Sequence, residues 1–398
     1  NSRLGAICEP SFFLEGKTMK KIRLFTPGPT MVPEDVLLEM ARPIEHHRTA
    51  WYKDLVKQCH ELLQYLFQTK AKVITLTGSG TSAAEACIVG CCPPGHKALV
   101  VQNGKFAERW VQVCQAFGID HTELPIEWGH GARVEQVQKA MDADRKIDTV
   151  ICVHSETSTT ALTDVAAIGR LTRDRGAILI VDGITSVGAI PVKMDDWGVD
   201  AFITGSQKAL MLPPGLAFAA VSDRAWERID SGKTPMLYND LKAYRKSLAE
   251  WDVPYTPAVT LVRGLLTVLR GVKERGLENI WAETALLARA TRAAITAMGL
   301  KLYAKDPVDS VTAAVVPDGL DEGALRKTMR GTYGFQIAGG QGKVKGKIIR
   351  FSHMGYVDAF DTLGVISALE MTLVKMGFTL QIGAGVAAAQ KVFAESMK

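Results

Sequence analysis

The sequence predicts an α/β protein in which helices flank a mostly parallel, mixed sheet, with a smaller α+β domain at the C-terminal end. Three observations support this prediction. Short apolar runs alternate with helical patterns through the middle of the chain, and each run ends in turn residues. Such alternation is typical of parallel strands joined by crossover helices. Beyond Gly276 the pattern changes, and a length of 398 residues corresponds to about two domains.

The composition fits an ordinary globular enzyme, with 47% hydrophobic and 22% charged residues. The net charge of +5 is spread among interleaved acids and bases, so we expect no nucleic-acid partner. No stretch approaches the roughly 20 apolar residues of a membrane helix, so we expect no membrane association. The seven cysteines form no CxxC pair. They indicate reduced thiols in a cytoplasmic protein, and we expect no metal site.

Four regions are expected along the chain. Residues 1–18 are interpreted as a leader or a cloning remnant, because Met19 is a plausible native start. Residues 19–34 form an extended arm, since the segment Phe25–Pro33 is too rich in Pro and Gly for a helix or a central strand. Residues 35–276 form the large domain, and residues 277–398 form the small one.

The periodicity also predicts individual elements. In the large domain we expect helices at Glu34–Ala41, Trp51–Phe67, Thr81–Gly90 and Ala166–Arg175, and strands at Val73–Leu76, Ala98–Gln102, Thr149–Val153, Ala177–Asp182, Ala201–Ile203 and Ala217–Val221. In the small domain we expect helices at Leu277–Met298, Asp321–Met329 and Thr362–Met376, and strands at Lys301–Tyr303, Ser310–Val316 and Lys347–Ser352. The run Gly339–Gly342 indicates a flexible loop.

A glycine turn between a strand and a helix indicates an anion site. Gly78, Ser79 and Gly80 follow a predicted strand, and Thr81 opens the next helix, whose first N–H groups and dipole attract negative charge. The stretch also fits the GxGxxG/A pattern of dinucleotide folds, but the following strand ends in Gln102 without the acid that would hold a ribose. A single monophosphate, bound with the Ser79 and Thr81 hydroxyls, suits the stretch better.

A lysine and an aspartate follow two other predicted strands. Lys208 lies just past the strand Ala201–Ile203, and Asp182 ends the apolar run AILIVD. A buried lysine has a lowered pKa and can attack an aldehyde. A buried acid can hold the proton of a pyridine ring, so the pair suits pyridoxal 5'-phosphate. Polar residues follow each strand at the carboxyl edge, where ligands of parallel sheets bind: Ser79-Gly80-Thr81, His154-Ser155-Glu156-Thr157, Asp182 and Gln207-Lys208.

Seven motifs together resemble the class V aminotransferases of the fold-type I pyridoxal-phosphate enzymes, and most closely the alanine- and serine-glyoxylate aminotransferase group. They are TPGP at Thr26, TGSGTSAAEA at Thr77, NGKFAERW at Asn103, HSETST at His154, VDGITSVGA at Val181, GSQKALMLPPG at Gly205 and KIIRFSHMG at Lys347. The resemblance extends from about Phe25 to the C-terminus.

This resemblance implies roles for individual residues. Lys208 forms the Schiff base, Asp182 contacts the pyridine nitrogen, and Arg350 grips the substrate carboxylate through two parallel hydrogen bonds. The other implied contacts are the phosphate loop Ser79, Gly80 and Thr81 with Gln207, the stacking ring of Phe106, the hydroxyl of Thr157, the dimer-crossing Thr256 and the pocket residue Gly28. Thr160 stands where many members carry Gly, so the loop after Thr157 is expected to differ in shape.

The activity that follows is transamination of a small amino acid, alanine or serine, with glyoxylate or pyruvate as acceptor, in a homodimer with shared active sites. Other donors remain open, namely 2-aminoethylphosphonate, ureidoglycine and phosphoserine. A lyase of the same fold, such as a cysteine desulfurase, is a further alternative. It needs a thiol late in the chain, whereas every cysteine lies between Cys8 and Cys152. A non-catalytic binding protein would be expected to lack Lys208 or Asp182.

Overall fold

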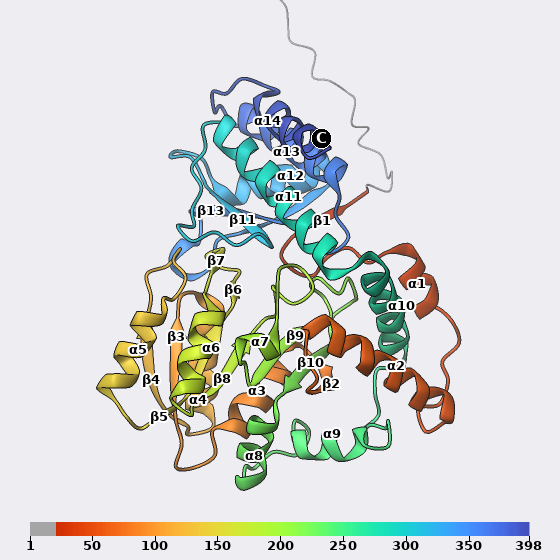
Figure 1. Ribbon diagram of the computed structural model, residues 1–398. Helices are drawn as coiled ribbons and strands as arrows, with labels where there is room; N and C mark the ends of the chain where they lie inside the picture. The colour runs from red at the N-terminus through yellow and green to blue at the C-terminus, as the bar shows by residue number, and fades with distance from the viewer. Residues whose placement is uncertain (1–20, 398) are drawn as a thin grey trace, which may run out of the picture.

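The computed structural model describes residues 21–397, so the leader predicted at residues 1–18 lies outside the described residues. Figure 1 shows a larger lower part around one sheet and an upper part around another. The larger sheet has seven strands, in the order β2 (Lys72–Gly78), β10 (Gly215–Val221), β9 (Ala201–Gly205), β8 (Ile178–Asp182), β5 (Ile147–Val153), β3 (Lys97–Gln102) and β4 (Asp120–Pro125). Only β10 runs antiparallel to its neighbours within this sheet. The predicted mostly parallel, mixed sheet is therefore confirmed.

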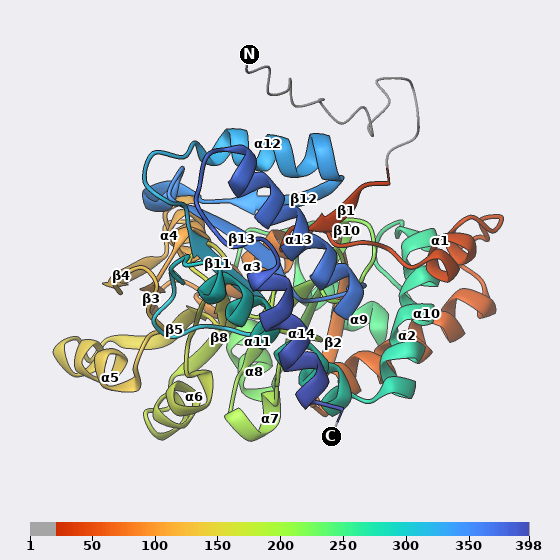
Figure 2. The ribbon, with the colours of Figure 1, turned by 90° about the horizontal axis from the view of Figure 1, so that it is seen from above.

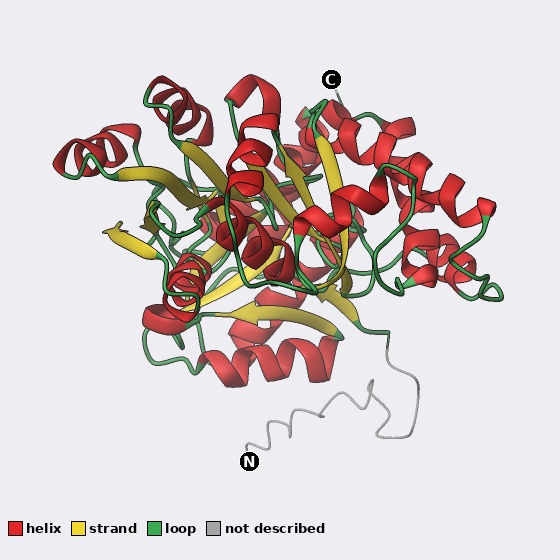
Figure 3. Cartoon of the chain, turned by 90° about the horizontal axis from the view of Figure 1, so that it is seen from below, coloured by secondary structure: helices red, strands yellow, loops and turns green. Residues whose placement is uncertain are grey.

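Helices cover both faces of the larger sheet because successive strand residues point to opposite faces. In β8, Leu179 and Val181 join one buried cluster, whereas Ile178 and Ile180 join another. The first cluster includes α2 (Ala50–Phe67), α5 (Val134–Ala143), α6 (Val165–Asp174), α7 (Met194–Trp197) and α10 (Val259–Arg275). The second includes α3 (Gly80–Cys91), α4 (Lys105–Ala116), α8 (Asp223–Ser231) and α9 (Leu241–Leu248). In Figure 3 the red helices lie on both sides of the yellow strands.

A second sheet forms the other part of the molecule. It has four strands in the order β1 (Arg23–Phe25), β12 (Phe335–Gly339), β13 (Ile348–Ser352) and β11 (Val311–Val315). A third buried cluster joins this sheet to α11 (Leu277–Ala297), α12 (Glu322–Tyr333), α13 (Ala359–Lys375) and α14 (Ala384–Glu395). Figure 2 shows β1 beside β12, so the N-terminal arm starts in the sheet built mainly from the C-terminal part.

Several details differ from the sequence prediction. Leu302 forms only an isolated bridge to Ala314 in place of the expected strand at residues 301–303. The predicted flexible loop at Gly339–Gly342 is a packed turn, since a Cβ on Gly340 would lie 1.8 Å from the Val344 carbonyl oxygen. This turn ends in the short 3-10 helix η1 (Gly342–Val344). The remaining elements are α1 (Glu34–Met40) and a two-stranded ribbon of β6 (Ser155–Glu156) and β7 (Ala161–Leu162).

Gly276 separates the helices of the two parts. It ends α10, which packs in the first cluster, and it immediately precedes α11, whose first residues Leu277 and Ile280 still pack in the first cluster and whose later residues pack in the third. No described helix is long and apolar enough to cross a membrane. The six cysteines of the described chain are all unpaired and buried.

The packing of α6 yields a prediction about glycine. A Cβ on Gly169 would lie 1.8 Å from the Trp197 carbonyl oxygen, which is backbone and cannot swing away. Gly169→Ala should therefore destabilise the protein by about 1 to 3 kcal/mol through overpacking, although alanine favours helices. Thermal unfolding of the purified variant measures the change.

The matched control is Gly271→Ala in α10, where nothing lies within 4 Å of the added Cβ. This change should stabilise the protein by about 0.5 to 1 kcal/mol, the ordinary helix preference for alanine. A Gly169 variant that melted at or above the parent temperature would contradict the close packing.

Candidate active site

Four strands of the larger sheet and the helix α4 converge on one cavity of about 160 Å³. Its lining comes from the segments that follow β2, β5, β8 and β9, at the carboxyl edge where parallel strands end together. The lining residues are Ser79, Gly80, Thr81, Phe106, Arg109, Val153, Ser155, Thr157, Asp182, Ile184, Thr185, Gln207 and Lys208. Eight of the predicted site residues therefore lie around a single cavity.

One end of this cavity is suited to an anion. Ser79 is the N-cap of α3, and Gly80 and Thr81 form its first turn, so unpaired backbone N–H groups and the positive end of the dipole face outward there. A Cβ on Gly80 would lie 2.5 Å from Ile184 Cδ1, so the close approach requires glycine. The side-chain oxygen of Gln207 is buried without a hydrogen-bond partner, beside the Gly80 backbone. The hydroxyls of Ser79 and Thr81, the side-chain amide of Gln207 and the first backbone N–H groups of α3 thus lie together at this end of the cavity.

Lys208 is held by the N-terminal arm. Its Nζ donates to the Pro27 carbonyl oxygen at 2.5 Å, and the Thr30 hydroxyl donates to the Lys208 carbonyl oxygen at 2.8 Å. Gly28 has a φ of +112°, and a Cβ there would lie 2.5 Å from Nζ. Gly28 is therefore in contact with the amine, although it does not line the cavity. Burial lowers the pKa of Lys208 to about 8, so about a tenth of the amine is uncharged at pH 7, far more than for an ordinary lysine.

Asp182 ends β8 and is 4% exposed. Burial raises the pKa of Asp182 to about 7, while the Ile184 N–H, which donates to Oδ1 at 2.9 Å, opposes this rise. A positive charge beside the carboxyl would lower this pKa again. Asp182 is therefore placed to stabilise a cation bound in the cavity.

The buried carboxylate of Glu156 positions the wall of the cavity that Phe106 forms. The sequence prediction did not name Glu156 as a site residue. Glu156 accepts from the backbone N–H groups of Phe106 and Ala107 at the start of α4, and from the N–H and hydroxyl of Ser158. Burial raises the pKa of Glu156, and these hydrogen bonds oppose the rise. A Cβ on Gly104 would lie 2.3 Å from Glu156 Cγ, so glycine is needed for the carboxylate to fit.

Arg109 is a second residue that the sequence prediction missed. It lines the cavity, its guanidinium lies 5.4 Å from the centre of the Phe106 ring, and it donates to the Thr81 hydroxyl at 3.2 Å. The NGKFAERW motif contained it, three residues after Phe106 and thus on the same helix face. Arg109 therefore adds positive charge between the aromatic ring and the anion-binding end.

The loop between Thr157 and Thr160 has an unusual backbone. Thr157 lines the cavity and its hydroxyl is 3.0 Å from that of Thr185. Thr160 has a φ of +56°, in the left-handed region that glycine favours. The threonine therefore adopts a backbone conformation suited to the glycine that many class V members carry at this position.

Arg350 lies in β13 of the second sheet and does not line the cavity directly. Its guanidinium donates to the Gly339 carbonyl oxygen from Nε and Nη2, and to the Thr157 carbonyl oxygen from Nη1 at 2.7 Å. Three of the five N–H groups of a guanidinium are thereby used, which leaves two for a ligand. Burial lowers the pKa of Arg350 to about 10, so it stays charged at neutral pH.

Thr256 is the predicted site residue that one chain does not bring to the cavity. It is exposed and lies beside Tyr255 on a different surface hollow, together with Thr77 and Tyr238. Its predicted contact with the phosphate therefore requires another subunit, and the structure of a single chain leaves that role a prediction.

The fold and this cavity define a fold-type I enzyme that uses pyridoxal phosphate, and sequence comparison agrees. The family described as Aminotransferase class-V matches residues 22–353. The chain belongs to this family, and it is a pyridoxal-phosphate-dependent aminotransferase. The resemblance predicted from the seven motifs is confirmed.

Three relatives extend over most of the chain. It is 41% identical to the soluble hydrogenase 42 kDa subunit of Anabaena cylindrica, covering 94% of this chain and 99% of the relative. It is 35% identical to L-aspartate–glyoxylate aminotransferase of Paracoccus denitrificans and 36% identical to serine–glyoxylate aminotransferase of Methylorubrum extorquens. Both alignments cover 94% of this chain and 96% of the relative.

Among the described residues, no group of three or more His, Cys, Asp or Glu is placed to hold a metal ion.

A solved structure has the same architecture. Ureidoglycine–glyoxylate aminotransferase of Bacillus subtilis superimposes with a TM-score of 0.90 at 28% identity, covering 95% of this chain and all of that one. The match confirms the fold class of this chain.

The residues of the cavity fit pyridoxal phosphate. Donors for a phosphate gather at the start of α3, and the unpartnered Gln207 amide can present its nitrogen there once it is turned. The flat ring of Phe106 suits an aromatic ring, Asp182 suits a pyridine nitrogen, and the Lys208 amine suits an aldehyde. Gly28 and Gly80 supply close approaches that a Cβ would block.

The pKa of Lys208 yields a prediction about cofactor attachment. The neutral amine attacks an aldehyde, so the attachment rate of apoenzyme should rise about tenfold per pH unit below the pKa and level off above pH about 8. Borohydride reduction at timed intervals, followed by peptide mass analysis of Lys208, measures this rate.

Free N-acetyl-lysine treated in parallel corrects for the pH dependence of the aldehyde itself. Attachment that kept rising to pH 10, as for an ordinary lysine, would contradict the lowered pKa. A label on another lysine would contradict the assignment of Lys208.

Proposed function

We propose that this enzyme transfers the amino group of a small amino acid, alanine or serine, to glyoxylate or pyruvate, with Lys208 as the residue that binds the cofactor. The observation that carries the proposal is the convergence of Lys208, Asp182 and the α3 N-terminus on one cavity. The similarity to relatives named for aspartate–glyoxylate and serine–glyoxylate transamination supports glyoxylate as acceptor. Aspartate joins the candidate donors on the same ground.

Pyridoxal phosphate supplies an aldehyde that takes up the amino group and a ring that accepts electrons. Ser79, Gly80 and Thr81, with Gln207, would hold its phosphate, and the Phe106 ring would pack against its aromatic ring. The Asp182 carboxylate would stabilise a positive charge on its ring nitrogen, and the Thr157 hydroxyl would offer a further hydrogen bond. The lowered pKa of Lys208 would let its free Nζ accept a proton from the substrate Cα and return it.

Arg350 is proposed to orient the substrate. It is buried, positively charged and adjacent to the cavity through its contact with the Thr157 carbonyl oxygen. Its two unused N–H groups suit a carboxylate, whereas its other three fix the guanidinium to two backbone carbonyls. Gly28 lies on the opposite side, against the lysine amine, and limits the space for a donor side chain.

We also propose that the active unit is a homodimer in which Thr256 of each subunit completes the site of its partner. Thr256 is exposed, and Leu237 beside it is 79% exposed, next to a stacked pair of Tyr238 and Tyr255. Large apolar side chains exposed together are typical of an interface. The division into a large domain (35–276) and a small domain (277–398) is part of the proposal, as is a cytoplasmic location, which suits the unpaired buried cysteines.

Other amino donors and a lyase activity remain as alternatives. The positions of the cysteines argue against the lyase activity. A cysteine desulfurase needs an accessible thiolate. The six described cysteines are buried, and burial raises the pKa of Cys152 to about 12. The positions of the described thiols therefore favour amino transfer.

An amino-donor screen tests the substrate class. Alanine, serine, aspartate and 2-aminoethylphosphonate are each offered with glyoxylate and with pyruvate, in the parent and in Arg350→Lys. The donors with an α-carboxylate should be preferred by the parent. The ammonium of Arg350→Lys cannot reproduce two parallel hydrogen bonds. This variant should therefore lose about 1.5 to 3 kcal/mol of transition-state binding for these donors, measured as a lower kcat/KM.

Arg326→Lys is the matched control, since Arg326 pairs with Glu322 on α12. It should leave kcat/KM nearly unchanged. If 2-aminoethylphosphonate turned over as well as alanine and suffered equally from the Arg350 change, the carboxylate role would be wrong. Failure of every donor with both acceptors would refute the proposed reaction.

Subunit complementation tests the shared site. Lys208→Ala should abolish activity, and Thr256→Asp should weaken it by repelling the partner's bound phosphate. Co-expressed together, they form mixed dimers with one intact site, so activity should recover to about a quarter of the parent level.

If the co-expressed variants were no more active than each variant alone, Thr256 would not contribute to the active site of the partner subunit. Sedimentation of the parent at assay concentration provides the second measurement. A fully active monomer would be incompatible with the proposal.

A further inference from the structure

A second and larger cavity, of about 670 Å³, lies away from Lys208. It is bounded by the first turns of α5 and α6 on one side and by the segment from Lys305 to Asp309, which leads into β11, on the other. It shares no lining residue with the Lys208 cavity. Its volume falls within the range of small-molecule sites in proteins.

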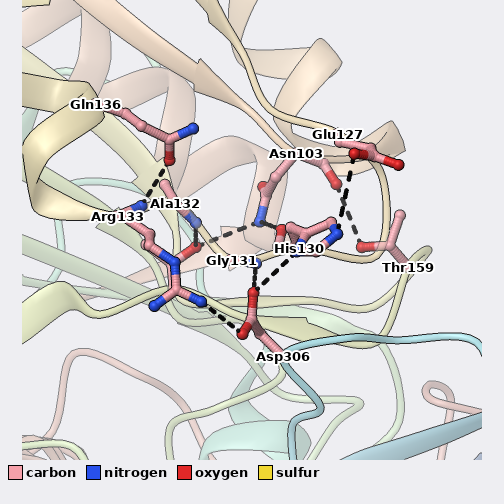
Figure 4. A network of polar contacts seen from close by, with 10 residues as sticks. Asn103, Glu127, His130, Gly131, Ala132, Arg133, Gln136, Thr159 and Asp306 are labelled. Atoms are coloured by element: carbon pink, nitrogen blue, oxygen red, sulfur yellow. Dashed lines mark hydrogen bonds and ion pairs between the residues drawn. The ribbon is translucent and has the colours of Figure 1, made fainter.

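Polar contacts fix the rim of this second cavity (Figure 4). Asp306 accepts from the Gly131 N–H at 3.1 Å and from the Arg133 guanidinium at 3.1 Å, and lies 3.3 Å from His130 Nδ1. The Leu162 N–H donates to the Asp306 carbonyl oxygen. These contacts join three separate segments of the chain, so the rim is already formed without a ligand.

The charges around the second cavity favour an anion. The first residues of α5 and α6 line it, and because the Asp164 carboxylate already accepts from the Ala167 N–H at the start of α6, the positive end of the α5 dipole is the one left for a ligand. Lys305 also lines it and has no ion-pair partner within residues 21–397. Four carboxylates line the cavity, and three of them already have partners. Asp306 contacts Arg133, Asp309 pairs with Arg292, and Asp164 caps α6. The fourth, Glu135, is exposed to solvent.

A buried and unpartnered histidine in the wall provides an independent indication of a ligand. His154 is 4% exposed and lines the second cavity, and its Nδ1 has no hydrogen-bond partner. Burial lowers the pKa of His154 to about 4, so the ring is neutral near pH 7. Its ring lies edge-on to Trp197 at 5.3 Å, and Ile190 adds apolar surface nearby. The wall thus combines a flat apolar surface with an unsatisfied polar ring.

We propose that this cavity binds a small aromatic anion, whose charged group lies at the α5 N-terminus near Lys305 and whose ring packs on Trp197 beside His154. The site is close to the catalytic cavity along the chain. His154 faces the second cavity, whereas Ser155 and Thr157 line the first.

The test is titration of the holoenzyme with 1-anilinonaphthalene-8-sulfonate, an aromatic anion, followed by calorimetry and by energy transfer from tryptophan. One saturable site per chain is expected. The uncharged analogue N-phenyl-1-naphthylamine should bind more weakly, because it lacks the charged group for the α5 N-terminus and Lys305.

Lys305→Ala, alone and with Arg133→Ala, should weaken binding of the sulfonate, by roughly tenfold for the double variant. The matched control is Lys301→Ala, an exposed lysine outside the cavity, which should bind like the parent. Transamination without the probe should be the same in all variants, which verifies that each is folded. The proposal is overturned if no saturable site exists, if the Lys305 variants bind as the parent does, or if the neutral analogue binds as tightly.

Discussion

The burial of one lysine at the carboxyl edge of the larger sheet is the constraint on which the rest of the site depends. Taking the Lys208 amine out of water lowers its pKa to about 8, and the same surroundings raise that of Asp182 to about 7. The amine is held by a single carbonyl oxygen, that of Pro27. Pro27 belongs to the N-terminal arm, and because β1 within this arm pairs with β12, the environment of the lysine requires both sheets to be in place.

One guanidinium connects the two parts of the molecule beside the cavity. Arg350 reaches from the second sheet to the Thr157 carbonyl oxygen. Within the larger part, Glu156 receives four hydrogen bonds, which tie the start of α4 to Ser158, the residue after Thr157. The position of the loop that carries Thr157 therefore depends on both parts.

The same fold serves relatives that are named for different amino donors. The solved ureidoglycine–glyoxylate enzyme superimposes at a TM-score of 0.90, and sequence relatives are named for aspartate and serine. In our proposal the strand ends around Lys208 hold the cofactor, and the side chains near Gly28 and Arg350 select the donor. Fold similarity alone therefore supports the reaction class more strongly than it supports any single donor.

The sequence by itself determined the α/β class, the mostly parallel sheet and the grouping of Ser79, Asp182 and Lys208 at strand ends, because these depend on local periodicity and turn residues. It missed elements such as β4, β12, α4, α5, α8, α9, α10 and α14. It also missed the role of the buried Glu156, the role of Arg109 in the wall and the second cavity. It could not place Gly28 against Lys208, since 180 residues separate them and only packing brings them together. Contacts between distant segments depend on how the two sheets pack, and no local pattern encodes that distance.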